Sequence, residues 1–210
     1  MKIAVIAANG RLGKVFVEEA LANGHDVTAG IRGESRLTPH SSLTIMQCDA
    51  TQIDDVTNLI KEHDIVVSCI GHVKSSRPNV QTAATKNIVT VMEALQLKRF
   101  IDVTGTGVRF PDDKITFIDR ILNLGISVID PSRVKDGQNH QKVLLKSDLD
   151  WTTIRILKLQ NVPVAPYELR LNGPTKIYVG RREVARAMLT VINNHSFIKQ
   201  APIIGYIDKR

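Results

Sequence analysis

The sequence predicts an α/β protein with a doubly wound, mostly parallel sheet, helices on both faces and a small loop-rich C-terminal part. Short β-branched runs alternate with amphipathic stretches, as they do where parallel strands are joined by helical crossovers. A turn of small residues follows the first apolar run directly. The chain has 210 residues, 43% of them hydrophobic and 23% charged, which fits one large core and therefore a single domain over residues 1–210.

The pattern of elements is clearest in the first half of the chain. Apolar runs predict strands at residues 2–6, 26–31, 42–48, 65–70 and 99–103. The fourth of these is apolar throughout, as a strand covered on both faces would be. Amphipathic segments predict helices at residues 11–22, 53–62 and 80–95, and Gly24 is placed to end the first helix.

The second half of the chain is less regular. It predicts helices at residues 115–124, 135–145 and 182–192, and strands at residues 151–157, 176–179 and 201–207. Pro163, Pro166 and Pro174 interrupt residues 160–175, which indicates a loop over the sheet in place of a regular element. We expect residues 157–210 to stay within the one domain and to cover the substrate side of its cleft.

A phosphate-binding turn is the strongest chemical signal. The segment Ala7-Ala8-Asn9-Gly10-Arg11-Leu12-Gly13 joins a predicted strand to a predicted helix, so its backbone N–H groups and the positive end of the helix can hold a pyrophosphate. Its spacing differs from the common G-x-G-x-x-G, and Ala7, where the first glycine is expected, requires a negative φ. This context predicts a dinucleotide-binding Rossmann fold, with a Rossmann domain that has lost its ligand as the alternative.

The end of the second strand favours NADP over NAD. An acid there would hold the ribose 2′-hydroxyl of NAD, but this chain has Ile31 and Arg32. The nearby acid, Asp26, begins the strand, roughly 16 Å away at about 3.3 Å per residue. Arg32, with Arg11 and Arg36, can instead bind a 2′-phosphate. The alternative is that these arginines are ordinary solvated loop residues.

Composition argues against several other classes of protein. The net charge is +7, but no basic run reaches five residues and aromatic residues make up only 4%, so we expect no nucleic-acid partner. No apolar run is long enough to cross a membrane, and no secretory signal precedes the first strand. Cys48 and Cys69 lie in predicted strands, which suggests reduced core thiols in a cytoplasmic protein. No histidine or cysteine pair has metal-ligand spacing, so we expect no metal.

Six segments in this order resemble the atypical short-chain dehydrogenase/reductases, particularly the NmrA-like and flavin/biliverdin-reductase-like group. They are AANGRLG at 7–13, Ile31-Arg32, CDAT at 48–51, SCIG at 68–71, KNIVTVMEALQLKRFIDVTGTG at 86–107 and SDLDWTTIR at 147–155. The resemblance implies an adenine beside Asp49 and Ala50, a ribose above Cys69, Ile70 and Gly71, and a nicotinamide near Thr104. The alternatives are that Asp49 caps a helix, Gly71 turns the chain and Thr104 ends a strand.

The usual proton donor of short-chain dehydrogenases is missing from the sequence. None of its three tyrosines is followed by a lysine four residues later, so no Tyr-x-x-x-Lys pair exists. The remaining candidates for a catalytic role are Thr104, Thr106 and His140. His140 shares a predicted helix face with Val143 and Leu144 and could point toward the nicotinamide, although a buried structural histidine would show the same pattern. His72 is a further candidate of small weight, and Asn87 is expected to fix a backbone carbonyl.

These residues support three hypotheses of function. The first is an NADP-dependent oxidoreductase that transfers a hydride to a small planar or carbonyl-bearing acceptor. The second is a regulatory protein that senses NADP(H) without catalysis, and the third is an NADP-dependent epimerase or dehydratase. A small-molecule partner is expected in the first and third, and the chain could form a homodimer.

Overall fold

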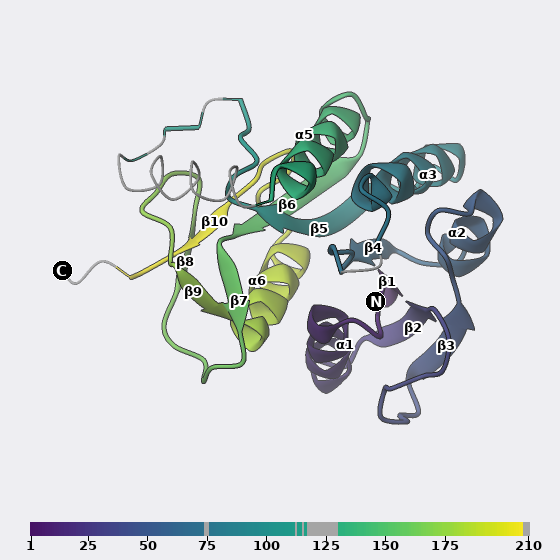
Figure 1. Ribbon diagram of the computed structural model, residues 1–210. Helices are drawn as coiled ribbons and strands as arrows, with labels where there is room; N and C mark the ends of the chain where they lie inside the picture. The colour runs from purple at the N-terminus through teal and green to yellow at the C-terminus, as the bar shows by residue number, and fades with distance from the viewer. Residues whose placement is uncertain (74–75, 112, 115, 117–129, 208–210) are drawn as a thin grey trace.

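The computed structural model describes residues 1–210 except 74–75, 112, 115, 117–129 and 208–210 (Figure 1). Its strands are β1 (Lys2–Ile6), β2 (Asp26–Ile31), β3 (Leu43–Gln47), β4 (Ile65–Ser68), β5 (Arg99–Gly105), β6 (Asp150–Ile156), β7 (Lys158–Gln160), β8 (Glu168–Arg170), β9 (Tyr178–Gly180) and β10 (Ile203–Gly205). Its helices are α1 (Arg11–Ala22), α2 (Ile53–Ile60), α3 (Val80–Ala94), α5 (Pro131–Leu145) and α6 (Arg181–Asn193).

The main sheet has eight strands in the order β3-β2-β1-β4-β5-β6-β10-β8. Every neighbouring pair is parallel except β10 and β8, which form an antiparallel edge. The strand order reverses between β1 and β4, and ligands of such sheets bind outside the carboxyl ends of the strands at this point. The predicted doubly wound, mostly parallel α/β fold is confirmed.

Two hydrophobic cores lie on opposite faces of the sheet. Ile3 and Val5 of β1 pack in one core, together with α1 and α6, whereas Ala4 and Ile6 pack in the other, together with α2, α3 and residues of α5. This division follows the two-residue period of a strand, which sends alternate side chains to opposite faces. Figure 1 shows α1 and α6 side by side, and the two helices are in contact. The turn after β1 therefore leads onto one face of the sheet, and the helices after β3, β4 and β5 cover the other.

The predicted loop at residues 160–175 is wrong in part. Strand β8 falls inside it and extends the main sheet along β10, and β7 ends at its first residue and pairs with β9 in a separate two-stranded sheet. Strands of three residues between prolines carry too little periodicity to be recognised in the sequence. The rest of the segment is irregular, as its prolines predict.

Most predicted boundaries fall within a few residues of the observed ones. The largest differences are that α5 begins at Pro131, four residues before the predicted start, and that β10 covers three of the seven predicted residues. The predicted helix at 115–124 lies, apart from Thr116, outside the described residues. None of the described helices is both long and apolar enough to span a membrane.

Candidate dinucleotide site

The turn after β1 packs tightly under the start of α1. The backbone N–H of Ala8 donates to the carbonyl of Gly30 in β2 at 3.0 Å, and that of Gly10 donates to the carbonyl of Ala7 at 3.0 Å. A Cβ atom on Gly13 would lie 2.4 Å from the carbonyl oxygen of Ala7, closer than real contacts allow. Gly13 is therefore required for the helix to begin directly on the turn, as in a phosphate-binding turn.

Ala7 adopts a left-handed backbone conformation, and the expectation of a negative φ is wrong. Its φ is 60°, a region that costs a residue with a Cβ on the order of 1–3 kcal/mol. This conformation lets the Ala7 carbonyl accept the Gly10 N–H and so closes the turn. Ala7 therefore has the left-handed backbone conformation that glycine adopts easily, and its Cβ makes this conformation strained.

The N-terminus of α1 has no side-chain cap. Gly10 is the N-cap residue, no acid lies in the first turn, and no described side chain accepts from it. The N-cap residues of α2 and α6 likewise make no side-chain cap bond, whereas Asp130 caps α5 through the Arg133 N–H and Asp136 accepts from two N–H groups in the first turn of α3. An uncapped first turn leaves N–H groups free for an anion, and the helix dipole favours negative charge there. The turn therefore fits a pyrophosphate.

The loop after β2 is held from two sides. The Asn9 amide donates to the carbonyl of Glu34 at 2.7 Å, and its oxygen accepts from the N–H of Arg36 at 2.9 Å. The Gln47 amide makes two hydrogen bonds with the backbone of Gly33, at 2.9 and 3.1 Å. Arg32 lies in this loop with an exposed side chain, next to the phosphate turn. The loop that carries Arg32 is thus fixed at the end of β2, the place where Rossmann folds bind the adenosine ribose.

Glu34 is an acid close to this site that the prediction of NADP from the sequence left out. It lies three residues beyond the end of β2, and its side chain is exposed. A carboxylate at this place could accept a hydrogen bond from the 2′-hydroxyl of NAD. In the sequence of this loop, Glu34 lies between Arg32 and Arg36. The choice between NADP and NAD depends on which of these side chains contacts the ribose.

Asp49 and Ala50 follow β3, where the adenine was predicted. One carboxylate oxygen of Asp49 accepts from the N–H and the hydroxyl of Thr51, at 3.0 and 2.8 Å. The Thr51 N–H is also the main cause that lowers the pKa of Asp49, and Arg32 lowers it further. The Ala50 carbonyl accepts from the Asn87 amide at 3.0 Å, which confirms the structural role expected for Asn87. Asp49 thus shapes the turn before α2.

The segment after β4 passes beside the phosphate turn. Cys69 donates its N–H to the carbonyl of Ile6 at 3.0 Å, so the chain stays parallel to β1 up to this point. Burial raises the pKa of the Cys69 thiol to about 12, which keeps it neutral. Ile70 is half-buried and Gly71 is exposed at the carboxyl edge of the sheet. These residues lie where the resemblance places the ribose.

Thr104 and Thr106 lie at the end of β5, and both are buried. The Thr106 hydroxyl has no hydrogen-bond partner among the described residues, and such buried donors are rare unless a ligand or water completes them. Thr104 packs against Gly137 of α5, where an added Cβ would come within 3.2 Å of its hydroxyl oxygen. The end of β5, next to β4, thus carries a buried Thr106 hydroxyl without a partner among the described residues. The nicotinamide was expected near this end of β5.

His140 lies in the core and not at the cleft. Its side chain is fully buried, and Nε2 is paired with the carboxylate of Asp102 in the middle of β5. The same carboxylate accepts from the Thr153 hydroxyl at 2.6 Å. A ring with no exposed surface cannot reach a ligand outside the strand ends. His140 is therefore a structural histidine, which was the alternative to a catalytic role.

Two polar clusters near this edge carry no signal in the sequence. Asp136 of α5 binds His72 and the start of α3, and Arg155 of β6 forms an ion pair with Asp113. Arg155 also lies over the ring of Phe110, with 5.4 Å to the ring centre. The partners are 42 to 64 residues apart in the chain, so no local spacing could reveal them.

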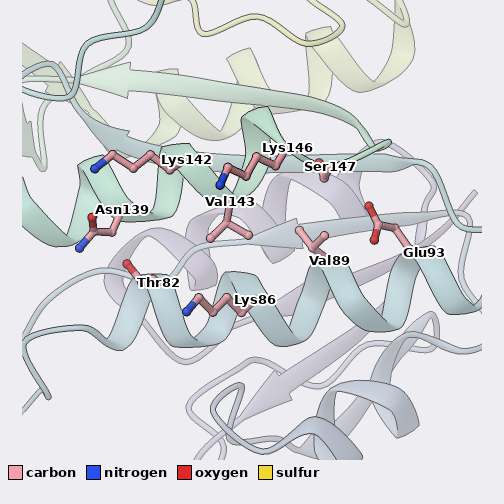
Figure 2. Close-up of a pocket in the computed structure, with 9 residues that line it drawn as sticks. All are labelled: Thr82, Lys86, Val89, Glu93, Asn139, Lys142, Val143, Lys146 and Ser147. Atoms are coloured by element: carbon pink, nitrogen blue, oxygen red, sulfur yellow. The ribbon is translucent and has the colours of Figure 1, made fainter.

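A groove of about 500 Å³ runs between α3 and α5, away from the phosphate turn (Figure 2). Its lining residues are Thr82, Lys86, Val89, Glu93, Asn139, Lys142, Val143, Lys146 and Ser147. None of them is a predicted site residue. The described residues hold no group of three or more histidine, cysteine or acidic side chains arranged to bind a metal ion.

The chain is similar in sequence to known proteins and in fold to several solved structures. An uncharacterized protein of Bacillus subtilis (strain 168), YwnB, is 25% identical over 154 residues, which cover 72% of this chain and 70% of YwnB. The oxidoreductase ylbE from Lactococcus lactis superposes with a TM-score of 0.80 at 15% identity, covering 98% of this chain and 91% of ylbE.

Two further solved structures match over almost their whole length. A short-chain dehydrogenase/reductase (wide type) from Veillonella parvula DSM 2008, in complex with NADP, has a TM-score of 0.81 at 17% identity and covers 98% of this chain and 94% of its own. ChuY, an anaerobillin reductase from Escherichia coli O157:H7, has a TM-score of 0.79 at 18% identity and covers 100% and 99%. These likenesses show the fold. The sequence itself matches the NAD(P)H-binding family over residues 7–195, and the chain belongs to that family.

Proposed function

We propose that this protein is an NADP-dependent oxidoreductase that reduces a small planar or carbonyl-bearing acceptor. The observation that carries the proposal is the uncapped start of α1 beside a loop that Asn9 and Gln47 hold with Arg32 exposed. The first feature fits a pyrophosphate, and the second fits the additional phosphate of NADP. The Veillonella protein, which was solved with NADP, and ChuY, a reductase, support this assignment by analogy of fold.

The residues of the chain would bind the dinucleotide along the carboxyl edge. The N–H groups of the first turn of α1 would donate to the pyrophosphate, and Arg32, with Arg11, would neutralise the 2′-phosphate. Arg181 at the start of α6 lies within the electrostatic reach of Arg11; burial lowers the pKa of Arg181, and the Arg11 charge lowers it further. When bound, the reduced nicotinamide supplies a hydride.

The end of β5 would position the acceptor. The unpaired hydroxyl of Thr106 can donate to a carbonyl oxygen or accept from a carboxamide, and Thr104 lies beside it. Fixed placement of both reactants can account for much of the rate acceleration in a hydride transfer. The absence of a Tyr-x-x-x-Lys pair also suits a second candidate, a protein that binds NADP(H) as a signal and has no turnover.

Turnover with a panel of acceptors separates these two functions. Purified protein is mixed with NADPH and, in turn, with free flavins, quinones and conjugated carbonyl compounds, and the absorbance of the reduced nicotinamide is followed. The oxidoreductase proposal expects acceptor-dependent loss of that absorbance that saturates with acceptor. Tight binding of NADPH with no turnover on any member of the panel would refute it and favour the sensor.

A further inference from the structure

His72 is held at the carboxyl edge of the sheet by a buried carboxylate. Its Nε2 lies 2.9 Å from Oδ2 of Asp136, and the two side chains are 10% and 1% exposed. His72 follows Gly71, four residues beyond the end of β4, and its ring pairs with Asp136 of α5. The Gln81 amide donates to the carbonyl of Val103 at 3.0 Å, which fixes this start of α3 beside the end of β5. His72 therefore lies next to the strands on which the acceptor would be placed.

The carboxylate of Asp136 is fixed by hydrogen bonds other than the one to His72. It accepts from the backbone N–H groups of Gln81 and Thr82, at 2.9 and 3.0 Å, and from the Thr82 hydroxyl. An acid from α5 thereby caps α3, and its orientation does not depend on the histidine. The carboxylate can hold the imidazole in one orientation, as an acid does in other histidine–carboxylate pairs.

The second ring nitrogen of His72 is not fully enclosed by the described residues. Nδ1 of His72 has no hydrogen-bond partner among the described residues, and it is not completely buried. Nδ1 of His140, by contrast, is completely buried and has no partner among them. A histidine with one nitrogen fixed on a carboxylate and the other accessible can give or take a proton at the accessible nitrogen. Asp130 also interacts electrostatically with His72. The Arg133 N–H lowers the pKa of Asp130, and His72 lowers it further.

We propose that His72 is the proton donor of the reaction and that Asp136 positions it. This inference rests on the proposed oxidoreductase function. As the acceptor gains a hydride at one atom, its carbonyl oxygen or ring nitrogen gains an electron pair, and the Nδ1–H bond of protonated His72 breaks to give that atom a proton. The neutral imidazole, still bound to Asp136, then takes a proton from solvent. His72 thus replaces the tyrosine that the sequence lacks.

The test compares His72→Gln with His63→Gln, a histidine at the opposite edge of the sheet whose Nε2 pairs with Thr28. With a quinone that the wild type reduces, we expect kcat of His72→Gln to fall by about 10²-fold or more, with the Kd for NADPH within about twofold. The wild-type rate should decrease as the pH rises, because the step uses the protonated ring, and the His72→Gln rate should not. Added imidazole should restore part of the rate of His72→Ala, which a merely structural role would not allow.

Unchanged kcat in His72→Gln, or a lower kcat with the wild-type pH profile, would overturn the proposal while the oxidoreductase function stands. An inactive wild type would instead remove the function itself. Ring-proton NMR gives a readout that needs no turnover: the signal missing from His72→Gln should shift when NADP⁺ is added to the wild type, and that of buried His140 should stay. A His72 signal that does not respond to NADP⁺ would contradict its place at the site.

Discussion

The side chain of Asn9 ties the phosphate turn to Arg36: its Oδ1 accepts the Arg36 N–H at 2.9 Å. Its Nδ2 donates to the Glu34 carbonyl in the same loop at 2.7 Å. One amide therefore sets the distance between the pyrophosphate turn and the loop that would meet the adenosine ribose. Only a side chain with both a donor and an acceptor can make this pair of bonds.

Replacement of Asn9 by alanine should weaken NADPH binding about tenfold, a loss of about 1.4 kcal/mol, because the loop at 32–36 loses this support. The fold should persist, since Gln47 still holds Gly33. Isothermal titration with NADPH measures the effect. Asn193→Ala, at the exposed end of α6, is the matched control. Equal affinities of Asn9→Ala and wild type would show that the loop does not depend on this amide.

Arg32 and Glu34 make opposite predictions for cofactor choice. If Arg32 binds the 2′-phosphate, Arg32→Ala should lower NADPH affinity by about 10- to 100-fold and leave NADH affinity nearly unchanged. Glu34→Ala removes the neighbouring negative charge and should raise NADPH affinity slightly. The six dissociation constants of the wild type and the two variants for NADPH and NADH decide between the residues. A wild type without preference for NADPH, or a Glu34→Ala variant that loses NADH binding, would assign the ribose to Glu34.

The positive φ of Ala7 predicts a stabilising substitution. Ala7→Gly should raise the free energy of unfolding by about 1 kcal/mol, because glycine adopts this conformation without strain from a Cβ. Ala8→Gly in the same turn, where φ is not positive, should lower stability by roughly 0.5–1 kcal/mol. Urea denaturation of the three proteins measures both changes. Destabilisation by Ala7→Gly would mean that the left-handed conformation is not adopted in solution.

The fold was predictable because its signals are local. Each parallel strand is an apolar run, each crossover helix has its own amphipathic pattern, and Gly24 ends α1 with a φ of 76°. The small strands β7, β8 and β9 were harder, because three-residue strands are defined by their partners in the sheet. Their sequence pattern is too short to distinguish them from loops.

The phosphate turn was predictable for the same reason, and the polar side-chain pairs near the end of β5 were not. The phosphate turn and Arg32 lie in one stretch of chain whose order can be read directly. The His72–Asp136 and His140–Asp102 pairs join residues 64 and 38 positions apart, so helix spacing alone placed His140 on an inward face without showing its carboxylate partner. Burial by tertiary packing decided which histidine faces the cleft.

The two thiols predict a loss of stability at alkaline pH. Burial raises the pKa of Cys48 and Cys69 from 9.0 to about 12. Because the folded chain holds these protons more tightly than the unfolded chain, this contribution is complete below pH 9 and is lost as the pH rises toward 12. Urea denaturation with a reductant at pH 7, 9 and 10 tests this. The Cys48→Ala, Cys69→Ala double variant should show a smaller decrease between pH 9 and 10, and an identical decrease would contradict it.

A buried ion pair anchors the C-terminal part of the chain to α6. Glu183 is fully buried, Lys176 lies 2.9 Å from one of its carboxylate oxygens, and the other oxygen accepts the Ala165 N–H at 2.9 Å. Glu183→Gln should lower the free energy of unfolding by about 3–5 kcal/mol, because it leaves the Lys176 charge buried without its counter-charge. Glu18→Gln, which breaks a half-exposed pair with Arg182, should cost less than about 1 kcal/mol. Adding Lys176→Met to Glu183→Gln should recover much of the loss, since it removes the unpaired charge. If denaturation shows the two single glutamine variants to be equally stable, water reaches Lys176 and the pair is not the anchor.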